Sequence, residues 1–399
     1  MSDEKKQLVV GVTKETFPGE NRVSIVPDNI PQYLKAGMKV VVEAGAGYLA
    51  GFTDDNYREK GAEIVPDRKA VFDKSEIITQ VRGLGANPDK GRSDLELLNP
   101  NHTVISSFEP MTAQNEVKLF ADKGVKSFAM ELMPRITRAQ SMDTLSSMAT
   151  IAGYKAVLMA AEMLPKMFPM MMTAAGTISP AHVFVVGAGV AGLQAIASAK
   201  RLGAIVKAYD VRPAVKEQVE SLGATFVEME VDAQDSEDKG GYAKEMDEEF
   251  YRKQRELMTT VVAESDVVIT TAAIPGKKSP VLITEDMVNR MHPGSVIVDL
   301  AAERGGNCEL TKLDETVLHK GVSIIGPGNI SASVPFHASQ MYSKNLLTFL
   351  KHLVKDGQLN LDLNDEIVND TLMTRDGQVV NKRLIEIFGI GTNQERSEQ

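Results

Sequence analysis

A glycine-rich turn and an acidic residue downstream of it have the types and spacing that a dinucleotide site needs. In such a turn one glycine permits a tight bend, another lets the backbone approach the phosphates, and a third allows close packing of a helix on a strand. The backbone amides that open the helix, together with its dipole, favour a bound anion. We therefore predict that the pyrophosphate is bound by Gly187, Ala188, Gly189, Val190 and Gly192.

The elements on either side of this turn must position it. A β-rich run at 182–186 precedes the glycines, and an apolar helix-forming run begins at Val190 and stops at Gly203. A second β-rich run follows at 204–209. A glycine turn alone is often only structural, but a strand before it and a helix after it are the context of a nucleotide-binding βαβ unit. The sequence thus favours a nucleotide site over a plain turn.

Asp210 ends the second of these strands and lies at the distance typical of an acid that binds the ribose. Its carboxylate can accept a hydrogen bond from a ribose 2′-OH and repels a 2′-phosphate, which favours NAD(H) over NADP(H). Val211 and Arg212 belong to the same predicted site, and the charge of Arg212 leaves NADP(H) open. Ala272, at the end of a later strand, lies where nucleotide contacts fall in open α/β sheets.

Composition excludes several classes of function. The chain has 399 residues and a formal net charge of −10, which argues against nucleic acid as a partner. Cys308 is the single cysteine, so intramolecular disulfides and cysteine-based metal clusters are excluded, and no metal site is predicted. The polar start of the chain shows no leader peptide. We expect a soluble globular protein with room for two domains.

The most apolar stretch, residues 156–175, is interrupted by Glu162, Pro165, Lys166 and Pro169. A spanning helix needs about 20 nearly uncharged apolar residues. We therefore predict no direct membrane span and interpret the stretch as a buried helix and loop. Its methionines are predicted to be flexible core filler: Met159, Met163, Met167, Met170, Met171 and Met172.

Short apolar runs alternate with helical stretches in both halves of the chain, which predicts mainly parallel sheets. The expected strands are 8–12, 38–43, 63–65, 76–81, 103–108, 182–186, 204–209, 225–227, 267–271, 295–300 and 322–325. We predict an α/β fold of two Rossmann-like domains with parallel sheets separated by a cleft. The first domain comprises 1–143 and 328–399, and the nucleotide-binding domain comprises 144–327.

Two further segments have alternative interpretations. The glycine pair in 45–50 resembles a second nucleotide loop, but no helix begins directly after it, and Thr53 or Asp54 is expected to cap a later helix. The acidic stretch 228–249 contains Tyr242 beside two glycines. It is either a solvated loop or a flap that closes over a ligand.

The opening segment, Gly11-Val-Thr-Lys-Glu15 with Asn21-Arg22-Val-Ser-Ile-Val-Pro27, resembles that of alanine dehydrogenases and of the NAD(H)-binding component of proton-translocating nicotinamide nucleotide transhydrogenase. The resemblance continues through the glycine turn and covers nearly the whole chain. It implies an NAD(H) site here and a separate component that binds NADP(H).

Within that family, residues 135–146 resemble the transhydrogenase loop that holds the nicotinamide end of NAD(H). The resemblance implies cofactor contacts for Arg135 and Arg138, and a place beside the reacting ring for Gln140, Asp143 and Ser146. Asp143 also fits a plain helix N-cap, which the sequence alone would favour. Residues 241–243 resemble the mobile loop of the same protein, which favours the flap interpretation of Tyr242.

Residue chemistry favours transhydrogenase over alanine dehydrogenase. Oxidative deamination needs a general acid or base, and the chain reads Ser107-Phe108-Glu109 where alanine dehydrogenases carry a histidine. Glu303 and Arg82 replace their catalytic aspartate and substrate-binding lysine, whereas Arg22 is retained. A shifted role for His102 stays open. Hydride transfer between two nicotinamides needs only two rings held face to face.

Three functions remain open: transhydrogenase component, self-contained amino-acid dehydrogenase, and non-catalytic NAD-sensing module. For the first, the resemblance implies NADP(H)-binding and membrane-spanning partner components and a homodimer. It also implies a cytoplasmic location, peripheral on the inner face of the cell membrane through the partner subunits.

Overall fold

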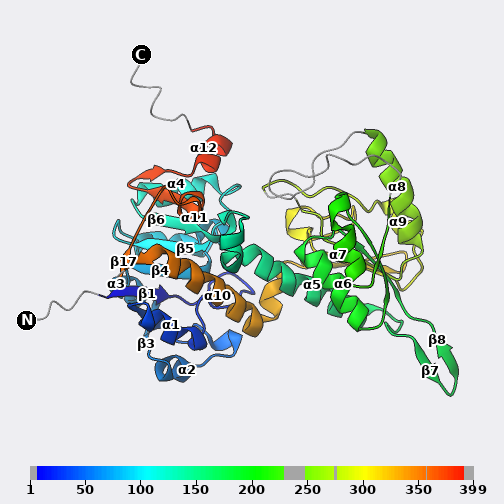
Figure 1. The fold of residues 1–399 in the computed structure, drawn as a ribbon, viewed down its shortest axis with the longest axis horizontal. Helices are drawn as coiled ribbons and strands as arrows, with labels where there is room; N and C mark the ends of the chain where they lie inside the picture. The colour runs from blue at the N-terminus through cyan, green and yellow to red at the C-terminus, as the bar shows by residue number, and fades with distance from the viewer. Residues whose placement is uncertain (1–6, 229–247, 274–275, 356, 391–399) are drawn as a thin grey trace, which may run out of the picture. The chain divides into compact units, whose positions relative to one another are not determined.

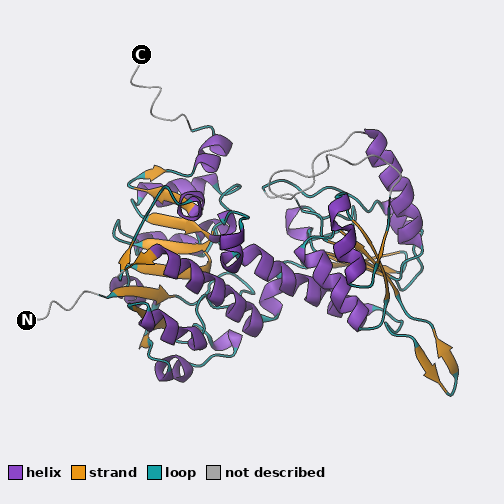
Figure 2. Ribbon diagram, viewed as in Figure 1, coloured by secondary structure: helices purple, strands orange, loops and turns teal. Residues whose placement is uncertain are grey.

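Two sheets, each in its own region of the chain, organise the computed structural model (Figure 1), which describes residues 7–228, 248–273, 276–355 and 357–390. The chain divides into unit 1, Met1–Met148 with Ala332–Gln399, and unit 2, Ala149–Ser331. Figure 2 shows helices packed around the strands of each unit. Most neighbouring strands are parallel, so the predicted α/β class with parallel-dominated sheets is confirmed.

The sheet of unit 1 has eight strands in the order β19-β18-β6-β5-β4-β1-β2-β3. Only β18 and β19 run antiparallel to their neighbours. The strands are β1 Leu8–Val12, β2 Met38–Glu43, β3 Glu63–Val65, β4 Ile77–Arg82, β5 Thr103–Ser107, β6 Lys126–Ala129, β18 Leu372–Arg375 and β19 Gln378–Val379. The helices are α1 Ile30–Lys35, α2 Asp54–Glu59, α3 Arg68–Lys74, α4 Gln114–Asp122, α10 Pro335–Leu353, α11 Glu366–Thr371 and α12 Lys382–Phe388. A short hairpin pairs β16 Val354–Lys355 with β17 Gln358–Leu359.

The sheet of unit 2 has seven strands in the order β11-β10-β9-β12-β13-β15-β14, and β14 alone is antiparallel. The strands are β9 His182–Val186, β10 Ile205–Tyr209, β11 Thr225–Phe226, β12 Val267–Thr270, β13 Val296–Asp299, β14 Thr316–His319 and β15 Val322–Ile325. The helices are α6 Val190–Arg201, α7 Lys216–Ser221, α8 Glu248–Ala263 and α9 Glu285–Asn289, and α5 Thr144–Met163 runs across the division between the units.

Strand β9 shows why these apolar runs form central strands. Val183 and Val185 lie in one hydrophobic cluster, whereas Phe184 and Val186 lie in another. Since successive side chains of a strand point to opposite faces, both faces of the sheet are buried. Helices must therefore cover the two faces, which is the usual arrangement of parallel sheets.

Each strand expected from the sequence is present with its ends within a residue or so of the prediction. Strands β6, β14, β16, β17, β18 and β19, each of four residues or fewer, were not expected, and neither was the hairpin that follows α5. The glycine pair near Gly47 leads into a 3₁₀ turn, Tyr48–Ala50, and α2 begins only at Asp54. Thr53 caps α2 through a capping box, as expected, so the second glycine loop has no helix directly behind it.

The prediction that the methionines of 156–175 fill the core holds for Met159, which packs against the hydrophobic core of unit 2, and was wrong for the other five. Beyond α5 the chain forms a hairpin, β7 Met171–Thr173 with β8 Gly176–Ile178, that extends from the body of unit 2 (Figure 1). Met170 is 59% and Met172 is 83% exposed, and three further methionines are also exposed. Apolar composition suggested burial, but a two-stranded hairpin has no opposite layer that could cover its side chains.

Candidate functional site

The glycine turn of unit 2 follows β9 and leads directly into α6. Gly187 has φ of +96°, a left-handed conformation that favours glycine, and its carbonyl accepts a hydrogen bond from Thr271 Oγ1 at 3.0 Å. A Cβ on Gly192 would lie 1.8 Å from the Gly187 carbonyl oxygen, so only glycine permits this packing of helix on turn. A Cβ on Gly189, the N-cap of α6, would meet no atom within 4 Å. The space in front of Gly189 is therefore open to a ligand.

Ala188 and Val190 complete this turn. The backbone N–H of Ala188 points at the carboxylate that follows β10, and Val190 begins α6 with its side chain 42% exposed. The amides of the first turn of α6 have no carbonyl partner within the helix. They form a positively polarised surface of the kind that binds phosphate.

Asp210 lies beside the glycine turn, at the end of β10. Its Oδ2 accepts a hydrogen bond from Ala188 N at 2.7 Å, and its Oδ1 accepts one from Arg212 N at 2.9 Å. The Arg212 guanidinium binds both oxygens, Nε to Oδ1 and Nη2 to Oδ2, each at 2.9 Å. The structure thus brings Asp210, Arg212 and the turn together, and Val211 packs against an apolar cluster of unit 2.

Ala272 follows β12 and is held by a residue that the sequence did not single out. Asn307 Oδ1 accepts a hydrogen bond from Ala272 N at 3.0 Å, and its Nδ2 donates to Ala272 O at 2.8 Å. Asn307 in turn donates its backbone N–H to Asp299 Oδ2 at 2.7 Å. Asp299 is fully buried and also accepts from Thr270, Ala301, Cys308 and Thr311. The only sign of Asn307 in the sequence was that this polar residue follows a Gly-Gly pair.

In unit 1, the segment 135–146 contains a 3₁₀ turn, Thr137–Met142, and continues into the start of α5. Ala139 and Met142 are buried in the core, and Asn345 of α10 donates to the Ser141 carbonyl at 2.9 Å. Arg138 binds both oxygens of Asp365 at 2.8 and 3.1 Å, so this arginine holds the turn in place. The side chains of Arg135 and Gln140 are exposed.

Asp143 precedes the first residue of α5 and acts there as an N-cap. Its Oδ1 accepts from Ser146 N at 2.9 Å, and its Oδ2 accepts from Ser146 Oγ at 2.5 Å. This is the plain role that the sequence alone favoured, and it places Asp143 and Ser146 side by side on one face. Tyr242 and the segment 241–243 lie outside the described residues.

A second polar group, which we call the Arg22 cluster, lies at the carboxyl ends of β1, β4 and β6: Glu15, Glu20, Arg22, Arg82 and Glu131. Arg22 Nε and Nη2 donate to the two oxygens of Glu20 at 2.7 and 2.6 Å, and Arg82 Nε donates to Glu20 at 3.2 Å. The Arg82 guanidinium also lies 4.4 Å from the centre of the Phe17 ring. Of the residues in this cluster, only Arg22 and Arg82 were expected from the sequence, as positions that correspond to the substrate site of alanine dehydrogenases.

Burial and charge set the protonation of this cluster. Burial favours neutral Glu20, but hydrogen bonds and charge from Arg22 lower the pKa of Glu20. Burial, with the charge of Glu20 added, raises the pKa of Glu15 to about 8. Burial and the charge of Glu109 raise the pKa of Glu131 to about 7. Near neutral pH the carboxyl group of Glu15 is therefore mostly protonated and that of Glu131 partly so.

His102 has a structural environment. Its side chain is buried, its Nε2 lies 3.0 Å from the Phe72 carbonyl, and its Nδ1 accepts from Asn99 N at 3.2 Å. Burial lowers the pKa of His102. Both ring nitrogens are used by the surrounding chain, so a shifted catalytic role for this histidine has no support in the geometry.

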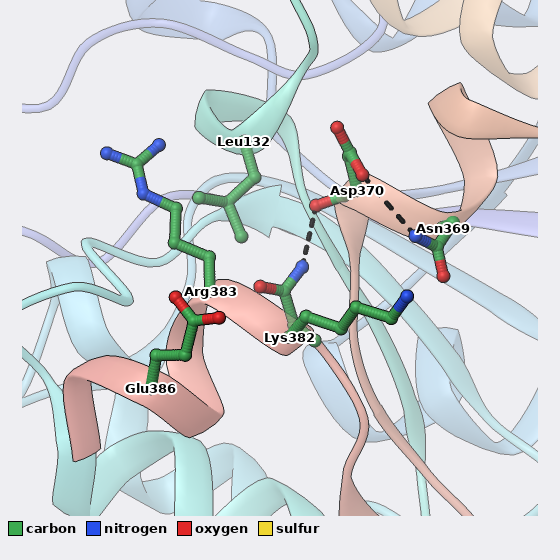
Figure 3. Close-up of a pocket in the computed structure, with 7 residues that line it drawn as sticks. Leu132, Asn369, Asp370, Lys382, Arg383 and Glu386 are labelled. Atoms are coloured by element: carbon green, nitrogen blue, oxygen red, sulfur yellow. Dashed lines mark hydrogen bonds between the residues drawn. The ribbon is translucent and has the colours of Figure 1, made fainter. Parts of the chain in front are cut away.

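A cavity of about 270 Å³ lies between α11 and α12 and contains none of the predicted site residues. Figure 3 shows its lining, which includes the acids Asp370 and Glu386 and the cations Lys382 and Arg383. Charges of both signs thus surround it, and Asn381 donates its side-chain amide to the Asp370 carbonyl at 2.8 Å. We assign it no role.

Among the described residues, no group of three or more His, Cys, Asp or Glu side chains is arranged to hold a metal ion. Within the same described ranges, none of the helices is long and apolar enough to cross a membrane.

Comparison with known proteins gives consistent matches. Two family models fit the chain: Alanine dehydrogenase/PNT, N-terminal domain, over residues 11–152, and Alanine dehydrogenase/PNT, C-terminal domain, over residues 156–382. An NAD(P) transhydrogenase alpha-subunit protein of Rhodospirillum rubrum is 46% identical over 380 residues, 94% of this chain and 99% of that protein. Alanine dehydrogenase of Bacillus subtilis (strain 168) is 28% identical over 396 residues, 96% of this chain and 95% of that protein. A solved transhydrogenase from Sinorhizobium meliloti superposes with a TM-score of 0.84 at 43% identity, covering 93% of this chain and 100% of that one.

Proposed function

Because the chain belongs to the alanine dehydrogenase/PNT family of oxidoreductases, we propose that it is the NAD(H)-binding component of a proton-translocating nicotinamide nucleotide transhydrogenase. It exchanges hydride between NAD(H) bound here and NADP(H) bound on a separate component. The observation that carries the proposal is the glycine turn with Asp210 beside it. An open space before Gly189, the unpaired amides of α6 and a carboxylate at the ribose position fit a dinucleotide.

The residues of this chain bind and orient, and they do not move protons. The first amides of α6 bind the pyrophosphate, and Asp210 accepts a hydrogen bond from the ribose. Gln140, Asp143 and Ser146 are proposed to orient the nicotinamide end, with Arg135 contacting the cofactor and Arg138 holding the turn through Asp365. Bound NADH supplies a hydride, a hydrogen nucleus with two electrons, to an oxidised nicotinamide, and no acid or base is required.

An amino-acid dehydrogenase is the second candidate, and two observations weigh against it. The chain is more similar to the transhydrogenase subunit, at 46% identity, than to the alanine dehydrogenase, at 28%. Its one histidine near the lost catalytic position, His102, is buried and held by backbone groups. We expect the purified protein to bind NADH without deaminating alanine.

A homodimer is included in the proposal, and the exposed methionines of the β7–β8 hairpin support it. Exposed apolar side chains gathered on one projection are typical of interaction surfaces, where methionine is enriched. Met172, at 83% exposure, is the most exposed of them. Met172→Lys should shift the protein toward monomer in sedimentation experiments, and an unchanged dimer would exclude the hairpin from the interface.

The NADP(H)-binding and membrane-spanning partners, and hence attachment to the inner face of the membrane, are proposed from the transhydrogenase subunit to which this chain is similar. The direct test mixes this protein with candidate partner fractions and follows hydride transfer from NADH to an NADP analogue. Gln140→Asn keeps an amide but withdraws it by one methylene. It should lower transfer by on the order of a hundredfold with little change in NADH affinity. Equal losses of transfer rate and NADH affinity would show that Gln140 contributes to binding only.

A further inference from the structure

The Asp210–Arg212 pair is a two-charge unit buried beside the proposed adenosine ribose. The side chains of Arg212 and Asp210 are only 15% and 7% exposed. Two guanidinium nitrogens and two backbone amides donate to the carboxylate. The guanidinium is thereby aligned with the group that the ribose must approach.

We propose that Arg212 is a latent 2′-phosphate ligand, and that Asp210 excludes NADP(H) by neutralising and holding this arginine as well as by direct repulsion. The inference rests on the proposed NAD(H) site. In nucleotide-binding α/β folds a carboxylate at this position accepts from the 2′-OH, whereas a nearby arginine accommodates a 2′-phosphate. Here both residues are present, and the fork geometry that binds one carboxylate also fits one phosphate.

Removing the carboxylate changes the balance of charge at the ribose. In Asp210→Ala the guanidinium of Arg212 loses the acceptor that occupies two of its nitrogens. A dianionic 2′-phosphate then meets a cation in a largely buried place, where charge–charge attraction is screened less than in bulk water. The chain would bind 2′-phosphorylated nucleotides through Arg212.

The experiment uses the full chain and measures dissociation constants of NADH, NADPH, 5′-ADP and 2′,5′-ADP by calorimetry. The two ADP probes isolate the adenosine end. In Asp210→Ala we expect 2′,5′-ADP to bind about 10- to 100-fold more tightly than it binds the unaltered protein. The gain should disappear in Asp210→Ala with Arg212→Gln, and it should shrink as salt is raised. A gain that survives loss of Arg212 overturns the proposal, as does a folded Asp210→Ala protein without any gain.

Asp286→Ala is the matched control. Asp286 of α9 pairs with Arg290, the C-cap residue of that helix, whose Nε and Nη2 both lie near Asp286 Oδ2, at 3.1 and 3.0 Å, but both side chains are more than half exposed. This variant should leave all four dissociation constants unchanged. If Asp286→Ala also bound 2′,5′-ADP more tightly, the gain would come from the change in net charge and not from Arg212. If Asp210→Ala fails to fold, Asp210→Asn answers the same question with a neutral isostere. Failure of the unaltered protein to bind NADH or 5′-ADP would instead refute the proposed function.

Discussion

The two sheets of this protein use the same edge for different purposes. In unit 2 the carboxyl ends of β9 and β10 carry glycines, unpaired amides and one arginine-held carboxylate. In unit 1 the carboxyl ends of β1, β4 and β6 carry the Arg22 cluster, in which Glu20 binds the guanidinium groups of Arg22 and Arg82. One edge leaves backbone donors of the glycine turn open, whereas the other is filled by an ion-paired carboxylate and two guanidinium groups.

The difference shows that a parallel α/β sheet offers a binding edge without dictating its use. Small residues make the edge of unit 2 accessible, whereas large charged side chains fill that of unit 1. The glycine turn should therefore be sensitive to added volume, and the Arg22 cluster to removed charge.

The largest expected effect is on the Arg22 cluster. The side chain of Glu20 is fully buried and that of Arg22 is 7% exposed, so Glu20→Ala leaves a buried cation without its partner. The free energy of unfolding of unit 1 should fall by about 3 to 5 kcal/mol. Urea unfolding checks this, with Glu20→Gln as the control that keeps hydrogen-bonding atoms. A loss below about 1 kcal/mol would mean that water, not Glu20, solvates Arg22.

Added volume at the glycine turn should have the next largest effect. In Gly192→Ala the new methyl group meets a backbone carbonyl at 1.8 Å, which should cost roughly 1 to 3 kcal/mol and abolish tight NADH binding. Gly189→Ala meets nothing within 4 Å, so it should melt like the unaltered protein yet bind NADH more weakly. Thermal melts beside NADH titrations separate the two, and full NADH affinity in Gly189→Ala would remove that glycine from the phosphate site.

The buried carboxyl groups of the Arg22 cluster should make the stability of unit 1 depend on pH. Because the pKa of Glu15 is raised to about 8 in the folded protein, the folded state holds a proton that the unfolded chain releases near 4.5. The free energy of unfolding should therefore fall as pH rises from about 4.5 to about 8, by at most about 1.4 kcal/mol per pH unit. Glu15→Gln should flatten this portion of the profile, leaving the share of Glu131, whose own Gln variant is the control. An unchanged slope in Glu15→Gln would show that Glu15 is ionised in the fold.

The smallest effect is expected where a charge pair is exposed. Arg138 is half exposed, so Arg138→Gln should lower the free energy of unfolding far less than Glu20→Ala does. The hydrogen bond from Arg138 lowers the pKa of Asp365 to about 2, and the pair therefore stabilises the fold above about pH 4 and loses its effect as pH falls toward 2. Urea unfolding of both proteins at about pH 6 and near pH 2 tests this. A loss comparable to that of Glu20→Ala would contradict the role of burial.

The edge of unit 2 could be predicted from sequence because its signals are local. A strand, three glycines, a helix and Asp210 lie within one βαβ unit, and each needs only its neighbours in the chain. Arg212 was visible too, but its hold on Asp210 depends on rotamers that spacing does not specify.

The remaining features depend on residues far apart in the chain. Asn307 binds Ala272, and Asp365 binds Arg138, across long stretches of sequence without a shared motif. Glu20 lies two residues from Arg22, yet its burial follows from packing of the sheet and α10. The burial of the exposed methionines in 156–175 was mispredicted because apolar composition shows that a segment is hydrophobic but not whether another layer of the fold covers it.

The exposed hairpin has a chemical consequence of its own. Thioether sulfur is oxidised by peroxide to the sulfoxide, which turns an apolar side chain into a polar one and is reversible by reductases. Met172 and its neighbours present their sulfur atoms to solvent, whereas the thiol of Cys308 is buried and burial raises its pKa to about 11, which keeps it protonated and unreactive. Oxidative damage would therefore begin on the exposed hairpin before it reaches the interior of unit 2.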